Sequence, residues 1–139
     1  MNVELLRRIQ KAILEEPLRI NMDKWAYCPD ETEDPPPCGT VACIAGWAIA
    51  LSRDLRGEDL VNYLYLDVPA CGIQPFGAAI GVLSLGFVEA GHLFFVGEWP
   101  KKFIDALTER LPGTPGYARV VSDRIDFFID TAAKYGSPA

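Results

Sequence analysis

Cys38-Gly39-Thr40-Val41-Ala42-Cys43-Ile44-Ala45-Gly46-Trp47-Ala48-Ile49-Ala50-Leu51 is the stretch that decides the fold, and it contains no charged side chain. A surface helix carries one apolar stripe, whereas a helix that is apolar on every side is buried by its neighbours. The stretch therefore predicts a buried central helix from Val41 to Leu51, at about residues 40–52, with Thr40 as its N-cap. Roughly a dozen residues are too few to span a membrane, which takes about 20.

Helix start and stop signals surround this central helix. An amphipathic helix is expected from Val3 to Glu16, with Asn2 as its cap and Pro17 at its end. The same signals predict further helices at Glu58 to Leu66, Pro75 to Leu83, Phe87 to Phe95, from Trp99-Pro100 to Leu111, and from Thr114-Pro115 to about Tyr135. The predicted fold is all-α, a single compact domain over residues 1–139, with five to seven helices packed around the central one.

Composition and charge disfavour several function classes. The chain has 139 residues, of which 50% are hydrophobic, and a formal net charge of −6. Nucleic-acid binding is disfavoured, because phosphate contacts need clustered Lys and Arg side chains and the chain has none. A basic amphipathic face for membrane contact is also missing, so no membrane partner is predicted. Residues 1–8 read as the start of an amphipathic helix and not as a signal peptide, which predicts a cytoplasmic location.

An acidic loop precedes the central helix and ends in Pro35-Pro36-Pro37. One interpretation is a solvated segment that leads the chain into the helix; the alternative is a docking loop for a basic partner. Three aromatic residues next to loops are candidates to line a pocket or interface. The predicted interaction residues are therefore Trp25, Tyr27, Asp30, Glu31, Glu33, Asp34 and Trp99.

Cys38 and His92 are the candidate catalytic residues. Cys38 stands just before the expected helix N-terminus, where the helix dipole stabilises a thiolate. A nucleophilic cysteine also needs a base, and His92 is the only histidine. The alternative interpretation is that both are ordinary packed residues.

The four cysteines are candidate metal ligands: Cys28, Cys38, Cys43 and Cys71. The Cys38-x4-Cys43 spacing occurs in zinc sites, although paired Cys-x2-Cys spacing is missing. A disulfide from Cys38 to Cys43 or to Cys28 is a second interpretation, and a reducing cytoplasm disfavours it. The third is that Cys43 and Cys71 are small buried hydrophobic residues. No cofactor is predicted, and zinc is the alternative.

Three pieces of the chain resemble a family of small uncharacterised proteins of bacterial and phage genomes. They are Cys38 to Ala48, with the pattern Cys-Gly-Thr-x-x-Cys-x-Ala-Gly, the stretch from Gly77 through His92 to Trp99-Pro100, and the stretch from Thr114-Pro115 to Ile129. The resemblance covers about residues 21–130. It implies a mostly helical intracellular domain, and it brings no catalytic or binding residue with it.

No catalytic constellation stands out in the sequence, so enzymatic activity is not the first expectation. We expect a non-enzymatic accessory protein that binds a protein partner or a copy of itself, since half of its residues are apolar. The alternatives are a cysteine-dependent enzyme or small-molecule binder that uses Cys38 and His92, and a small zinc-binding domain.

Overall fold

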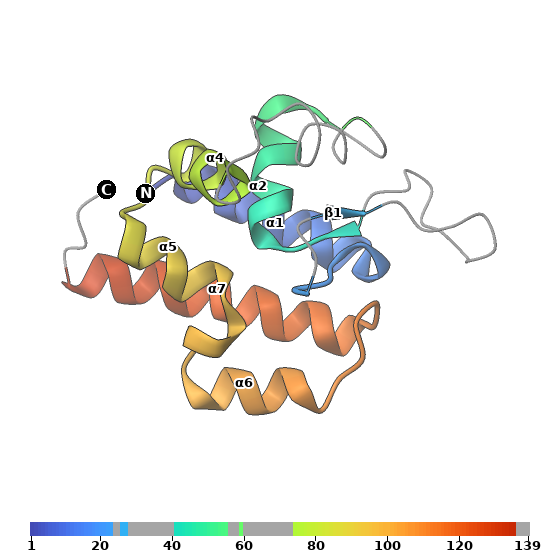
Figure 1. Ribbon diagram of the computed structural model, residues 1–139. Coiled ribbons are helices and arrows are strands. Elements are labelled where there is room, and N and C mark those ends of the chain that lie inside the picture. Colours follow the sequence, from blue (N-terminus) through green and yellow to red (C-terminus); the bar gives the residue numbers. More distant parts are fainter. Residues whose placement is uncertain (24–25, 28–40, 56–58, 60–73, 136–139) are drawn as a thin grey trace.

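The computed structural model describes residues 1–23, 26–27, 41–55, 59 and 74–135 (Figure 1). Six α-helices occur among these residues, which confirms the predicted all-α fold of five to seven helices. They are α1 (Val3–Glu15), α2 (Ile44–Arg53), α4 (Gln74–Leu83), α5 (Phe87–Phe94), α6 (Lys101–Thr108) and α7 (Pro115–Tyr135). Two short 3-10 turns, η1 (Pro17–Arg19) and η3 (Val96–Glu98), and two short strands, β1 (Ala26–Tyr27) and β2 (Val41–Ala42), complete the set.

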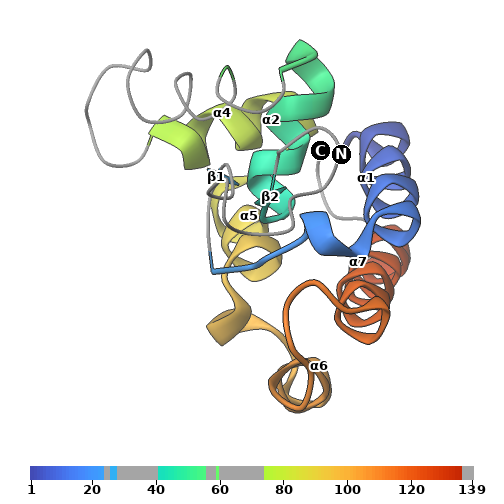
Figure 2. The same ribbon diagram turned by 90° about the vertical axis from the view of Figure 1, so that its right-hand side faces the viewer.

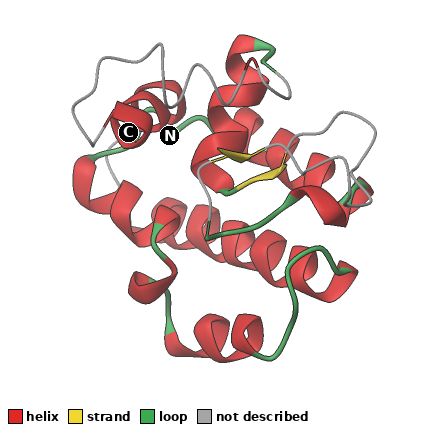
Figure 3. Ribbon diagram, turned by 45° about the vertical axis from the view of Figure 1, so that its right-hand side comes forward, coloured by secondary structure: helices red, strands yellow, loops and turns green. Residues whose placement is uncertain are grey.

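The central helix begins later than predicted, so the proposed start at Val41 is wrong. Val41 and Ala42 form β2, which pairs antiparallel with β1, and Ala42 also bridges to Ile20 (Figure 3, strands in yellow). Helix α2 starts only at Ile44, with Cys43 as an extended N-cap. An apolar run with a β-branched residue at its start suits a strand as well as a helix. Backbone pairing with a distant segment decided between them.

The prediction that this helix is buried on every side is confirmed from Ile44 to Ala50, whereas Leu51 is only partly buried. Every residue from Ile44 to Ala50 is buried. The helix then runs to Arg53 and ends at Asp54, whose backbone is left-handed with φ of 54°. The indole N–H of Trp47 required a partner inside the core. It donates to the backbone carbonyl of Arg19 at 3.0 Å.

Helices α1 and α7 lie side by side, and α2 and α4 pack against each other and against α1 (Figures 1 and 2). Helix α5 contacts both α2 and α7, while α6 packs on α7 at the edge of the molecule (Figure 2). Side chains from all of these helices except α6, and from the chain after η1, are fully buried in one continuous core: Leu6, Ile9, Ile13, Ile20, Ile44, Ile49, Leu83, Leu93, Val121 and Ile125.

Capping residues place the helix ends close to where the sequence predicts them. The Asn2 side chain accepts from the backbone N–H of Leu5 at 3.0 Å and starts α1. Asn2 also donates through its own backbone N–H to the carbonyl of Leu83 at 2.7 Å, which joins α1 to the end of α4. Thr114 caps α7 by accepting from the backbone N–H of Tyr117 at 3.3 Å.

Two predicted helices, from Trp99-Pro100 to Leu111 and from Glu58 to Leu66, differ from or lie beyond what the structure describes. The helix predicted from Trp99-Pro100 to Leu111 is shorter in the structure, where Pro100 is the N-cap of α6 and the helix ends at Thr108. The predicted helix from Glu58 to Leu66 lies outside the described residues, apart from Asp59. Within the described part of the chain, no single helix is long and apolar enough to cross a membrane. Residues Gly77–Leu83 of α4 and Phe87–Phe94 of α5 would together have the length and composition of such a span, and a bend of 104° separates them.

Candidate ligand pocket

A pocket of about 400 Å³ opens between α5, the turn at Trp99-Pro100 and the second half of α7. We call it the Arg124 pocket. Its lining residues are Glu89, His92, Glu98, Trp99, Pro100, Arg124, Phe127, Phe128, Thr131 and Ala132. The volume falls in the range typical of small-molecule sites.

Helical spacing brings the lining residues of α7 together. They follow one another at intervals of three, four, seven and eight residues from Arg124, which places them on one face of the helix. Glu89 and His92 stand three residues apart on α5 and therefore share a face as well. The pocket thus forms where one face of α7 meets one face of α5.

The pocket walls are held in place by hydrogen bonds and ring contacts. The Glu89 side chain accepts from the backbone N–H of Gly86 at 3.0 Å and caps the start of α5. The buried indole of Trp99 donates to the carbonyl of Leu93 at 2.9 Å. Phe127 meets Phe103 of α6 edge to face, with ring centroids 5.4 Å apart. These contacts fix the position of the apolar wall.

Arg124 is the charged group of this wall, and only 4% of it is exposed. Its Nη2 donates to the backbone carbonyl of His92 at 2.7 Å. Its buried Nε–H finds no hydrogen-bond partner among the described residues. Nor does any carboxylate of the described part of the chain lie within ion-pair distance of it. Buried charges are normally paired, so this arginine is incompletely satisfied.

Aromatic rings surround the Arg124 guanidinium in place of a counter-ion. The rings of Trp99, Phe103, Phe127 and Phe128 have their centroids 5.7–5.8 Å from its central carbon. Cation–π attraction of this kind offsets part of the desolvation cost. Burial still lowers the pKa of Arg124 to about 10. The side chain is therefore cationic at neutral pH, although burial disfavours its charged form.

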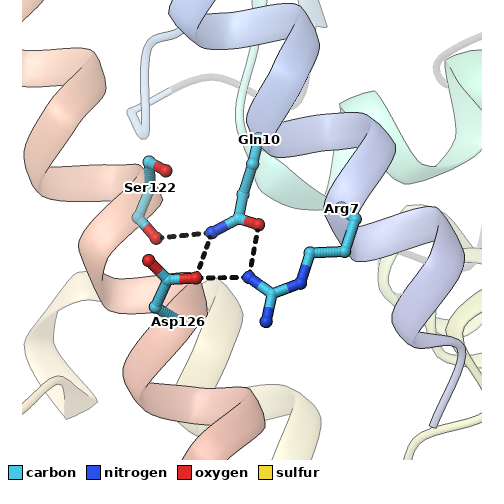
Figure 4. Close-up of polar contacts among 4 residues, drawn as sticks. All are labelled: Arg7, Gln10, Ser122 and Asp126. Atoms are coloured by element: carbon cyan, nitrogen blue, oxygen red, sulfur yellow. Dashed lines mark hydrogen bonds and ion pairs between the residues drawn. The ribbon is translucent and has the colours of Figure 1, made fainter.

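A second polar cluster on α7 behaves differently, and we call it the α1–α7 polar cluster: Arg7, Gln10, Ser122 and Asp126 (Figure 4). The Gln10 amide donates to the carbonyl of Ser122 at 2.9 Å and to the carboxylate of Asp126 at 2.8 Å. Arg7 donates to the Gln10 side-chain oxygen at 2.8 Å and forms an ion pair with Asp126. The hydrogen bond from Gln10, followed by those from Arg7, lowers the pKa of Asp126.

Another hollow, of about 530 Å³, lies between α1, η1 and α2. Some of its charges are matched within the chain. Arg19, for example, lies 3.0 Å from Glu16 and stacks over the Trp47 ring at 4.5 Å. The Arg124 pocket is the stronger candidate, because its charge lacks such a partner.

The structure brings together two of the residues that the sequence singled out. His92 and Trp99 both line the Arg124 pocket, His92 with an exposed side chain and Trp99 with a buried one. Only the backbone of Tyr27 is described. The other candidates lie outside the described residues: Trp25, Cys28, Asp30, Glu31, Glu33, Asp34, Cys38 and Cys71. The pairing of Cys38 with His92 therefore stays a prediction.

Cys43 is buried, as the packed-residue interpretation expects. It does not lie one turn inside the central helix, because α2 begins after it. Burial raises the pKa of the Cys43 thiol to about 11, although hydrogen bonds from nearby backbone N–H groups oppose the rise. The thiol is therefore protonated at neutral pH, which disfavours a nucleophilic role for Cys43. Among the described residues, no three His, Cys, Asp or Glu side chains converge on a common metal position.

Sequence reasoning missed Arg124 as a site residue. A signal was present, since Arg124 interrupts the apolar face of the last helix between Val120, Val121 and Phe128. A charge at such a position must be paired or must serve a ligand. What the sequence could not show is that α5 leaves space beside it.

Comparison of the chain with protein-family models, curated proteins and solved structures finds no match. The resemblance to the family of bacterial and phage proteins therefore stays a prediction.

Proposed function

We propose that this protein is a non-enzymatic binding module that holds an anionic ligand in the Arg124 pocket. One observation carries the proposal: a guanidinium that is 4% exposed lines an apolar pocket, and its Nε–H has no partner among the described residues. An uncompensated buried charge destabilises a fold. An anion in the pocket would supply the missing counter-charge and hydrogen bonds.

Two dyes of similar size test this proposal. Anilinonaphthalene sulfonate carries one negative charge, and N-phenyl-naphthylamine carries none. We expect the purified protein to bind the charged dye, and Arg124→Met to weaken that binding tenfold or more, in line with loss of a charge-assisted hydrogen bond. Binding of the neutral dye should change little, because the apolar walls remain. Fluorescence titration measures both affinities.

Arg119→Met is the matched control, since Arg119 lies on the same helix with an exposed side chain. It should leave both affinities unchanged. Equal binding of the charged dye by the wild type and Arg124→Met would refute the proposal. Circular dichroism confirms that each variant keeps its helices.

Self-association is a second candidate function, and we propose it on a separate observation. Phe87 and Val88 at the start of α5 are 71% and 70% exposed, although both are apolar. A second copy of the chain would cover this surface. Light scattering should then show a dimer that the double change Phe87→Ser and Val88→Ser converts to a monomer. A wild-type monomer at every concentration would contradict it.

We propose an accessory role in a bacterial or phage cytoplasm, on the basis of the resemblance of residues 21–130 to the family of small bacterial and phage proteins. A heterologous protein partner at the acidic loop and a zinc site at the remaining cysteines concern residues that the structure does not describe.

A further inference from the structure

We infer that the anionic ligand is a small monocarboxylic acid whose carboxylate is joined to a flat apolar body. This inference rests on the proposed function and names its ligand class. Three features of the Arg124 pocket lead to it: the shape of the cation, the balance of charge along the lining and the aromatic walls.

The guanidinium shape suits an oxyanion that accepts two parallel hydrogen bonds, such as a carboxylate. Arg presents five N–H donors in a planar fork, which matches the two oxygens of a carboxylate. The 2.7 Å bond from Nη2 to the His92 carbonyl holds the plane of the Arg124 fork. The Nε–H is left unsatisfied beside it. A fork that is already oriented loses little conformational freedom when a planar acid binds.

The charge balance disfavours ligands with two negative charges. Arg124 is the only arginine or lysine among the lining residues, whereas Glu89 and Glu98 both belong to the lining. One cation neutralises one carboxylate. A phosphate monoester carries about −1.5 to −2 charges at neutral pH, and its second charge would face two glutamates without compensation.

The walls favour a flat and apolar body. Trp99 and Phe128 are buried, and Phe127 forms the wall toward α6. Planar rings stack well against such side chains. Thr131 offers a hydroxyl two helical turns beyond Arg124, about 10 Å along α7. A ligand of one or two fused rings therefore fills the pocket, and a small polar substituent at its far end would meet Thr131.

Three naphthalene derivatives test the ligand class by isothermal titration calorimetry. Naphthoate carries one carboxylate, naphthamide is its neutral isostere, and naphthyl phosphate carries the larger charge. We expect the wild type to bind naphthoate at least tenfold more tightly than either of the others. Arg124→Met should reduce naphthoate binding to the level of naphthamide, and Arg119→Met should leave it unchanged.

Two conservative variants sharpen the test. Arg124→Lys keeps the charge and loses the planar fork, so it should weaken naphthoate binding several-fold. Glu98→Gln removes one exposed carboxylate from the lining, so it should improve naphthyl phosphate binding several-fold more than naphthoate binding. If Arg124→Lys binds naphthoate like the wild type, the fork argument is wrong.

The outcomes separate this inference from the proposed function. Tighter Arg124-dependent binding of naphthyl phosphate than of naphthoate would overturn the ligand class and leave the anion-binding proposal standing. Equal affinities for naphthoate and naphthamide in the wild type and in Arg124→Met would overturn both.

Discussion

Arg124 and Asp126 stand two positions apart on α7, yet their surroundings are opposite. Two residues turn a helix by about 200°, so Arg124 faces the pocket beside α5 and Asp126 faces α1. Asp126 accepts from Gln10 and pairs with Arg7, and the side chains of that ion pair are each 49% exposed. Arg124 is 4% exposed and has no carboxylate partner among the described residues.

The difference separates a charge that joins two helices from a buried charge that has no carboxylate partner among the described residues. In the α1–α7 polar cluster, Arg7 and Asp126 are each other's charged partners, and about half of each side chain is exposed to solvent. At Arg124 the chain supplies one carbonyl and four aromatic rings, which hold the guanidinium in place without neutralising it. The comparison predicts that removing the two charges will change stability in opposite directions.

The largest expected effect is a gain in stability from Arg124→Met. An apolar side chain of similar length removes the desolvated charge, and such replacements often stabilise a protein by about 1–3 kcal/mol. The lost bond to His92 offsets part of the gain. Urea unfolding at neutral pH measures the change. A fall in the free energy of unfolding would show that Arg124 holds the fold together, and the comparison would then break down.

A loss of stability is expected from Gln10→Ala. The Gln10 amide is buried and bonds to Ser122, Asp126 and Arg7. Its removal leaves the Ser122 carbonyl without that donor, which costs about 1–2 kcal/mol. Lys11→Ala, an exposed change on the same helix, is the control and should cost little. If both variants unfold at the same urea concentration, the α1–α7 polar cluster has no structural role.

Acid should weaken the fold through Asp126. Its folded-state pKa is lowered, chiefly by the hydrogen bond from Gln10. Its contribution is therefore complete above the ordinary aspartate pKa of about 4, and it is lost as the pH falls through the depressed value. The stability difference between wild type and Asp126→Asn should shrink over that range. Its size at neutral pH should stay below about 1 kcal/mol, because solvent screens the half-exposed pair.

The smallest effect is expected from Arg7→Ala. Exposed ion pairs contribute about 0–1 kcal/mol and are screened by salt. The cost of this variant should therefore decline when urea unfolding is repeated at high salt. A cost that does not respond to salt would assign the contribution of Arg7 to its bond with Gln10.

Much of the fold followed from local signals in the sequence. Asn2 at the start of α1 and Thr114-Pro115 at the start of α7 act within one turn of their own helices. The amphipathic spacing of α1 and the uniformly apolar α2 likewise predict burial without knowledge of neighbours. Such features depend on residues that are close together along the chain.

The start of α2 and the Arg124 pocket could not be predicted in the same way. Val41 and Ala42 are extended because β1 pairs with them, and that choice depends on residues about 15 positions earlier. Arg124 bonds to His92 across 32 positions. Periodicity marked the faces of α5 and α7, but it did not show which faces would meet or that a space would remain between them.

The pairing of the first helix with the last has a consequence for biosynthesis. Gln10 and Ser122 are 112 positions apart, and α1 and α7 lie against each other along much of their length (Figure 1). Ribosomes add about 5–20 residues per second, so α1 waits roughly 5–20 seconds for its partner. During that time its apolar face, with Leu6, Ile9 and Ile13, has no α7 to cover it. The nascent chain therefore completes its core only after α7 has been made, and until then the apolar face of α1 lacks that partner.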